Sequence, residues 1–276
     1  DVTHAYLPAI KELSAAGWQP IPLAEGARVE RYGAEGAVYF TVRPTKPAAE
    51  ETLLIAPEAL AALGTELVAF DAVWLNELPL EKQGDKWAIR FAHGADELHL
   101  VRIASRRTIP TWLLERARSH AVNASRVRGE QSRTPGLLAA IESLSQPQAP
   151  TAGALLPQLA TCRDKLDGAL ASITGTADDL FALSQRREIL QARQAVSALA
   201  VFATGAKLGL AGRKVGYPGQ TLALTAEGQA PSGVEIRLVT FDSAPGRVIV
   251  PSLELGSGSG PAAGASLRLE SKAPQD

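Results

Sequence analysis

The chain has 276 residues, of which 46% are hydrophobic, and its formal net charge is −1. This length predicts two or three domains, and a charge near zero gives no reason to expect nucleic acid or an anionic membrane as the main partner. No apolar run approaches the ~20 residues that a membrane-spanning helix needs.

An amphipathic helix is expected at the N-terminus, within residues 1–24. Leu7, Ile10 and Leu13 fall at helical spacing. Pro8 favours a start near Leu7, because proline is best tolerated in the first turn. Gly17 is a natural stop for this helix.

Residues 25–106 are predicted to form an antiparallel β-sandwich. Apolar and polar residues alternate there in short segments rich in β-branched and aromatic residues, and polar turns separate the segments. The strands are expected at 28–32, 37–43, 51–56, 66–70, 71–78, 87–91 and 97–103. A polar turn around Gly84 is expected at 81–86.

Residues 107–206 are predicted to be helical. The helices are expected at 110–128, 134–144, from near Pro157 to about 173, and from about 176 to 205. Pro157 marks a start because a proline in a helix interior removes a hydrogen bond. The last two helices are joined by a short loop, which predicts an antiparallel hairpin.

Residues 207–276 return to strand patterns and predict a small sandwich-like β-domain. Its strands are expected at 220–226, 233–241, 247–255 and 266–270, with a loop at 256–264. The whole chain is therefore predicted to be an α+β multidomain protein, with a β-sandwich, a helical hairpin or bundle segment and a small C-terminal β-domain.

Motifs that carry chemistry are absent from the sequence. It contains no Gly-rich phosphate loop, no nucleophile elbow and no His-Glu-x-x-His motif, so no catalytic residue, cofactor or metal site is predicted. His93 and His99 flank a turn that includes Asp96 and Glu97, but two different strands should hold them, and a solvated polar turn is favoured. Cys162 lies on an apolar helix face and is expected in the core.

Arginine is concentrated between residues 102 and 133, where eight Arg accompany two Glu. The segment is a candidate for binding an anion or a partner, with Arg107 and Arg118 on either side of Trp112. The alternative is a solvated face that pairs with acidic residues elsewhere. The candidate residues for anion or partner binding are Arg107, Trp112, Arg116 and Arg118.

Aromatic residues accompany the predicted sandwich. Sugar-binding modules stack sugar rings on exposed aromatic side chains, but the same residue types also form ordinary sandwich cores, and the core is favoured here. The candidate carbohydrate-binding residues are Tyr32, Trp74 and Trp87, and Tyr39 belongs to the same aromatic set.

Residues 5–105 resemble a segment of large glycoside hydrolases. In that segment the last helix of a catalytic (β/α)8 barrel leads into a C-terminal β-sandwich. The resemblance implies that the helix ending at Gly17 belongs to such a barrel, which would lie upstream, and it transfers no catalytic residue. The matching segments are Tyr6-Leu7-Pro8, Ala16-Gly17-Trp18-Gln19-Pro20, Val29-Glu30-Arg31-Tyr32-Gly33 and Tyr39-Phe40-Thr41-Val42-Arg43.

The resulting prediction is a non-catalytic accessory region of a secreted or periplasmic glycoside hydrolase-like protein, with the upstream barrel or carbohydrate as partner. Secretion is suggested by the start at Asp1, the absence of Met and the glycosylation acceptor pattern Asn123-Ala124-Ser125. The alternative is a structural or protein-interaction module that uses the helical hairpin and the Arg-rich segment. An intact enzyme of unknown class is the least favoured hypothesis.

Overall fold

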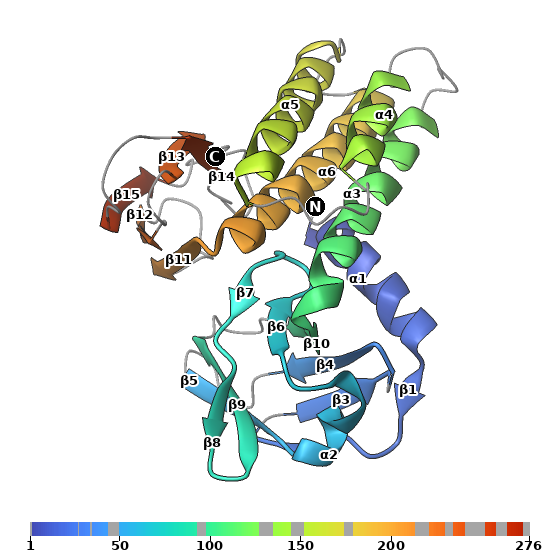
Figure 1. The fold of residues 1–276 in the computed structure, drawn as a ribbon, viewed down its shortest axis with the longest axis vertical. Coiled ribbons are helices and arrows are strands. Elements are labelled where there is room, and N and C mark those ends of the chain that lie inside the picture. The colour runs from blue at the N-terminus through green and yellow to red at the C-terminus, as the bar shows by residue number, and fades with distance from the viewer. Residues whose placement is uncertain are drawn as a thin grey trace.

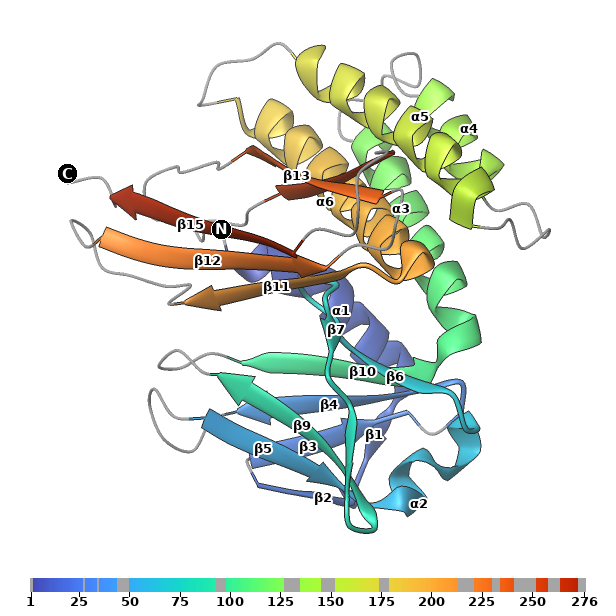
Figure 2. The ribbon, with the colours of Figure 1, turned by 60° about the vertical axis from the view of Figure 1, so that its left-hand side comes forward.

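The structure, a computed structural model, combines helices with antiparallel sheets, as the α+β prediction requires (Figures 1 and 2). Among the residues that it describes, no helix is both long enough and apolar enough to cross a membrane. The described residues are 2–26, 28–33, 35–43, 50–92, 98–126, 135–144, 152–173, 179–212, 221–229, 234–240, 252–257 and 264–272.

Two antiparallel sheets form the first half of the chain. The larger has the order β1 (Trp18–Gln19), β3 (Arg28–Tyr32), β4 (Ala37–Arg43), β10 (His99–Ser105), β6 (Leu67–Asp71) and β7 (Glu77–Leu78). The smaller has the order β2 (Ala24–Glu25), β5 (Glu50–Ile55), β9 (Lys86–Ala92) and β8 (Glu81–Gln83). Gly33 is required between β3 and β4, because its φ is 74° and a Cβ there would lie 2.6 Å from the Ala37 carbonyl oxygen.

A hydrophobic core joins the facing sides of the two sheets. Side chains alternate along β4, so that Val38, Phe40 and Val42 enter this core while Tyr39 points to the opposite face. The smaller sheet contributes Leu53 and Ile89. Both sheets therefore depend on one shared apolar layer.

The opposite face of the larger sheet is covered by helices. These are α1 (Val2–Ala16), α3 (Ile109–Arg126) and α6 (Leu180–Thr204), while α4 (Pro135–Ser143) and α5 (Ala152–Ala171) pack against α3 and α6 on the side away from the sheet. Phe70 of β6 meets both Trp112 of α3 and Phe202 of α6, with ring centroids 5.6 and 5.7 Å apart. A second core thus runs without interruption from the sheet into the helices.

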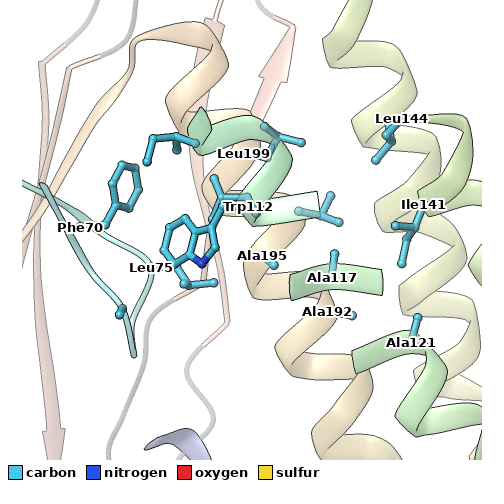
Figure 3. Close-up of a cluster of buried hydrophobic side chains, with 14 of the residues drawn as sticks. Phe70, Leu75, Trp112, Ala117, Ala121, Ile141, Leu144, Ala192, Ala195 and Leu199 are labelled. Carbon is cyan, nitrogen blue, oxygen red and sulfur yellow. The ribbon is translucent and has the colours of Figure 1, made fainter. Parts of the chain in front are cut away.

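Helices α3 and α6 pack along each other through small residues. Ala117 and Ala121 of α3 face Ala192 and Ala195 of α6, as Figure 3 shows. Small side chains at a contact let two helix backbones approach closely. Helix α5 also contacts α6, which confirms that the two helices predicted to form a hairpin pack together.

The ends of α6 follow the signals in the sequence. The Asp179 carboxylate accepts hydrogen bonds from the backbone N–H groups of Phe181 and Ala182, at 3.0 and 3.1 Å. Gly205 ends the helix in the left-handed conformation, with φ of 69°. The predicted boundaries of this helix are therefore correct to within a few residues.

Two predicted helix starts are wrong. Pro8 and Pro157 were each expected in a first turn, but they lie inside α1 and α5. A proline removes one hydrogen bond and crowds one carbonyl, and the remaining turns of helices of 15 and 20 residues continue past it.

The strand predicted at 71–78 is also wrong in its centre. The Asp71 carboxylate accepts from the backbone N–H groups of Val73 and Trp74, at 2.8 and 2.9 Å, and so ends β6 in a turn. The turn predicted at 81–86 is shorter than expected: Glu81–Gln83 form β8, which turns at Gly84 into β9. The short helix α2 (Pro57–Leu60) and the following 3-10 turn (Ala61–Leu63) were not predicted.

The C-terminal strands form two further antiparallel sets. One has the order β11 (Lys207–Gly212), β12 (Thr221–Gln229) and β15 (Gly264–Lys272), and the other pairs β13 (Val234–Thr240) with β14 (Ser252–Ser257). All four predicted strands overlap with these. The predicted loop at 256–264 was too long at both ends, because Gly256 and Gly264 pair within strands, and 258–263 lie outside the described residues.

Candidate functional site

A cleft of about 640 Å³ lies where α1, α3 and α6 meet the helix-facing side of the larger sheet. Ligand pockets usually span about 300–1,000 Å³, so the cleft has room for a small molecule. Most of the residues that line it are charged or polar. The residues on which its chemistry depends are Glu12, Tyr39, Arg102, Arg116, His120 and Glu188.

Several side chains of the inner wall of the cleft hydrogen bond to one carboxylate. Glu12 of α1 accepts a hydrogen bond from the Arg116 guanidinium, with Oε1 2.5 Å from Nε, and a bifurcated hydrogen bond from the single Trp112 indole N–H, with both carboxylate oxygens 3.1 Å from Nε1. The Tyr39 hydroxyl donates to the same carboxylate at 3.2 Å. The carboxylate is thus held by three side chains from two elements.

Arg102 is the second guanidinium of this wall. It lies directly opposite Tyr39 in the register of β10 and β4, and its Nε donates to the Tyr39 hydroxyl at 3.2 Å. Its Cζ lies 4.5 Å from the centroid of the Trp112 ring, which favours a cation–π contact. The side chain is 6% exposed, and within the described ranges its Nη1 has no hydrogen-bond acceptor.

Tyr39 remains a neutral phenol. Burial and the nearby Glu12 carboxylate raise the pKa of Tyr39 to about 12, although Arg102 acts in the opposite direction. The hydroxyl can therefore donate to Glu12 while it accepts from Arg102.

A second polar group lies along α3 and α6. His120 Nδ1 lies 2.8 Å from Glu188 Oε2, and the Asn123 amide donates to the same oxygen at 3.2 Å. Burial acts to raise the pKa of Glu188, but the hydrogen bond and charge of His120, with Asn123 and Lys11, hold this pKa below its ordinary value. Asn123, which belongs to the glycosylation acceptor pattern Asn123-Ala124-Ser125, is half-buried in this group.

The structure brings three of the four predicted anion- or partner-binding residues together. Arg107, Trp112 and Arg116 line the cleft, whereas Arg118 points away and pairs with Glu142 at 3.2 Å. The Trp112 ring is buried rather than open to a ligand, because Arg102 and Phe70 pack against it.

The predicted carbohydrate-binding residues are not brought together. Tyr32 lies in β3 of the larger sheet and hydrogen bonds to Glu30, while Trp87 lies in β9 of the smaller sheet. Trp74 lies in the turn after β6, where its carbonyl accepts from Gln194. All three are half-buried, and the Lys82 ammonium covers the Trp87 ring at 4.4 Å.

The remaining candidates were residues with metal or nucleophile chemistry. His99 is buried and stacks on Phe91, with ring centroids 4.8 Å apart, while His93, Asp96 and Glu97 lie outside the described residues. Where the chain is described, no group of three or more His, Cys, Asp or Glu residues is placed to hold a metal ion. Cys162 is buried in the core as predicted, and burial raises the pKa of its thiol to about 11.

Glu12, Arg102, His120 and Glu188 were not among the individual site residues predicted from the sequence, although Arg102 and His120 lie in the Arg-rich segment 102–133. Arg102 had a visible signal, because it is the one charge within the otherwise apolar run Leu100–Ala104, and a buried charge needs compensation. The other three come together only through helix packing. Comparison with models of known protein families and with curated protein sequences found no match for the chain.

Proposed function

We propose that the chain is a non-catalytic accessory region of a secreted or periplasmic glycoside hydrolase-like protein, and that it supports a catalytic barrel upstream of α1. In this proposal residues 25–106 are the β-sandwich that follows the barrel. The core shared by the two sheets supports that assignment. Residues 107–206 and 207–276 would be further domains of the same protein.

The observation that carries the proposal is an apolar surface on the N-terminal segment. Ile10 on α1 is 48% exposed and Trp18 on β1 is 60% exposed, and Leu7 and Ile21 in the same segment are also exposed. Large apolar side chains that are exposed together usually mark a contact with another protein surface. A barrel whose last helix is α1 would cover them.

Carbohydrate contact is the less favoured part of this proposal. The three aromatic candidates lie on separate elements, and Lys82 already covers the ring of Trp87. Sugar binding needs an open aromatic face, which Trp18 offers better than Tyr32, Trp74 or Trp87.

A protein-interaction module is the second candidate function. It is favoured by Leu180 and Phe181 in the first turn of α6, of which Leu180 is 76% exposed. These two side chains belong to the helical part of the chain, where the alternative hypothesis placed the contact with a partner.

The two candidates can be separated by a binding experiment. The region encoded upstream of α1 is expressed separately and its binding to this chain is measured by calorimetry. We expect Ile10→Asp with Trp18→Asp to abolish binding, while Leu180→Asp with Phe181→Asp leaves it unchanged. Equal affinity of wild type and the first double variant, or an upstream region without a barrel, would contradict the accessory role.

A further inference from the structure

We propose that the cleft between α1, α3 and α6 binds a small hydroxylated monocarboxylate, and that Arg102 holds the carboxylate group of this ligand. The inference goes beyond the accessory role and does not depend on it. It rests on a buried guanidinium with a free donor, on the charge balance around it and on the polar lining of the cleft.

Protein contacts orient the guanidinium of Arg102, but they do not provide acceptors for all of its N–H groups. Tyr39 accepts from its Nε, and Trp112 packs against its face. The buried Nη1 has no acceptor in the part of the chain that the structure describes. Arg102 also lines the cleft, and a guanidinium presents its N–H groups in a rigid fork that matches a carboxylate, so an anion bound there would supply the missing acceptor.

The charges on the inner wall do not cancel. Arg116 forms an ion pair with the Glu12 carboxylate, which also accepts hydrogen bonds from Trp112 and Tyr39. Arg102 is linked to this carboxylate through the Tyr39 hydroxyl, and two guanidinium groups beside one carboxylate leave the wall with one excess positive charge. Charged groups are buried in proteins when they are paired, so a bound anion completes this arrangement.

The other side chains of the cleft select the kind of anion. Glu12, Glu115 and Glu188 line it against five cations, Lys11, Arg102, Arg107, Arg116 and Arg187, so the lining as a whole attracts an anion. The one excess positive charge of the inner wall matches a single carboxylate better than a phosphate dianion.

Neutral polar groups complete the lining. Thr111, Ser119 and Gln191 provide hydroxyl and amide groups that can bind ligand hydroxyls. Lys11 and Arg187 add positive charge to the cleft and so attract an anion from solution. A sugar acid or a short hydroxy acid has the required chemistry, and the volume of about 640 Å³ accommodates either.

The test uses the full chain and calorimetric titration with sodium glucuronate, sodium lactate, glucose and inorganic phosphate at equal ionic strength. We expect glucuronate or lactate to bind at least about tenfold more tightly than glucose and phosphate. The tighter of the two acids identifies a sugar acid or a short hydroxy acid as the ligand. Phosphate or glucose binding as tightly as both acids, or no binding of either acid, would overturn the proposal.

Arg102→Met removes the charge at similar side-chain length, and Arg118→Met is the matched control because Arg118 lies outside the cleft in an exposed ion pair. We expect the first variant to lose at least about tenfold in affinity for the acid and the second to bind like the wild type. Wild-type affinity in Arg102→Met would refute the role of Arg102.

Folding of the variant supplies an independent readout. Because Arg102 brings an uncompensated charge into the interior, Arg102→Met should keep or raise the Tm of the ligand-free protein. In the unmodified chain the bound acid should raise the Tm above that in glucose. An unfolded Arg102→Met variant combined with no such rise in the wild type would show that the charge is structural and overturn the proposal.

Discussion

Glu12 and Arg116 form a partly buried ion pair between residues that are 104 positions apart in the chain. The Arg116 side chain is 5% exposed, and its Nη2 also donates to the Ala72 carbonyl at 2.9 Å. Through these contacts one guanidinium joins α1, α3 and the turn that follows β6. The position of α1 on the larger sheet therefore depends on a polar contact in addition to apolar packing.

Glu12→Gln is expected to destabilise the protein by about 3 kcal/mol, because it leaves the buried Arg116 guanidinium without a carboxylate. The free energy of unfolding from urea denaturation measures this loss. Glu142→Gln is the matched control, since Glu142 pairs with Arg118 in an exposed position and should cost less than about 1 kcal/mol. Similar losses in both variants would contradict the structural role of the buried pair.

The contribution of Glu188 to stability is expected to depend on pH. The pKa of Glu188 in the folded protein lies below its ordinary value of 4.5, because His120, Asn123 and Lys11 outweigh the effect of burial. A carboxyl with a depressed pKa stabilises the folded state above its unfolded pKa, and this stabilisation is lost as the pH falls through the folded pKa.

The difference in free energy of unfolding between wild type and Glu188→Gln tests this dependence. The difference should be largest at neutral pH and should shrink as the pH falls below about 4.5. Urea denaturation over a series of pH values measures it, with Glu142→Gln as the exposed control. A difference that does not change between neutral and acidic pH would refute the assignment.

Features with local signals were predictable from the sequence, as the ends of α6 show. Asp179 and Gly205 determine the backbone at those ends through contacts with near neighbours, so residue type and spacing were sufficient. The strand patterns of β3 and β4 were predictable for the same reason, because side-chain alternation is a local property.

The cleft was not predictable in this way. Glu12, Arg102 and Arg116 are brought together by the packing of α1, β10 and α3, and no spacing in the sequence indicates such a contact. The two helix starts predicted at Pro8 and Pro157 were wrong for a related reason. Pro8 and Pro157 are unfavourable locally, but the rest of each helix offsets one lost hydrogen bond.

Asp179→Ala is expected to cost about 1 kcal/mol in the free energy of unfolding, because two N–H groups at the start of α6 lose their acceptor. Asp179→Ser keeps a side-chain oxygen at the cap and should retain most of the stability. Urea denaturation compares the two variants with the wild type. Equal stability of the Ala and Ser variants would show that the cap hydrogen bonds do not contribute.

Cys162 is expected to be unreactive in the folded protein. Burial raises the pKa of its thiol to about 11, and thiol reagents attack the thiolate. A colorimetric thiol assay should detect no reaction under native conditions and one thiol per chain in denaturant, since the sequence contains one Cys. Rapid labelling of the native protein would contradict the buried position.

Phe70→Ala tests whether the larger sheet and the helices unfold together. Phe70 lies on β6 and packs against Trp112 of α3 and Phe202 of α6, so its removal opens a cavity where the sheet meets the helices. We expect a loss of about 3–5 kcal/mol. Ser119→Ala, a small change on an exposed position of α3, serves as the control.

Helical circular dichroism and Trp fluorescence should report one shared transition in both the wild type and Phe70→Ala, at lower denaturant for the variant, because a single core continues from the sheet into α3 and α6. Two separate transitions, with the helical signal unchanged by the substitution, would show that the segments before and after residue 106 fold independently. Their packing would then contribute little to the stability of either segment.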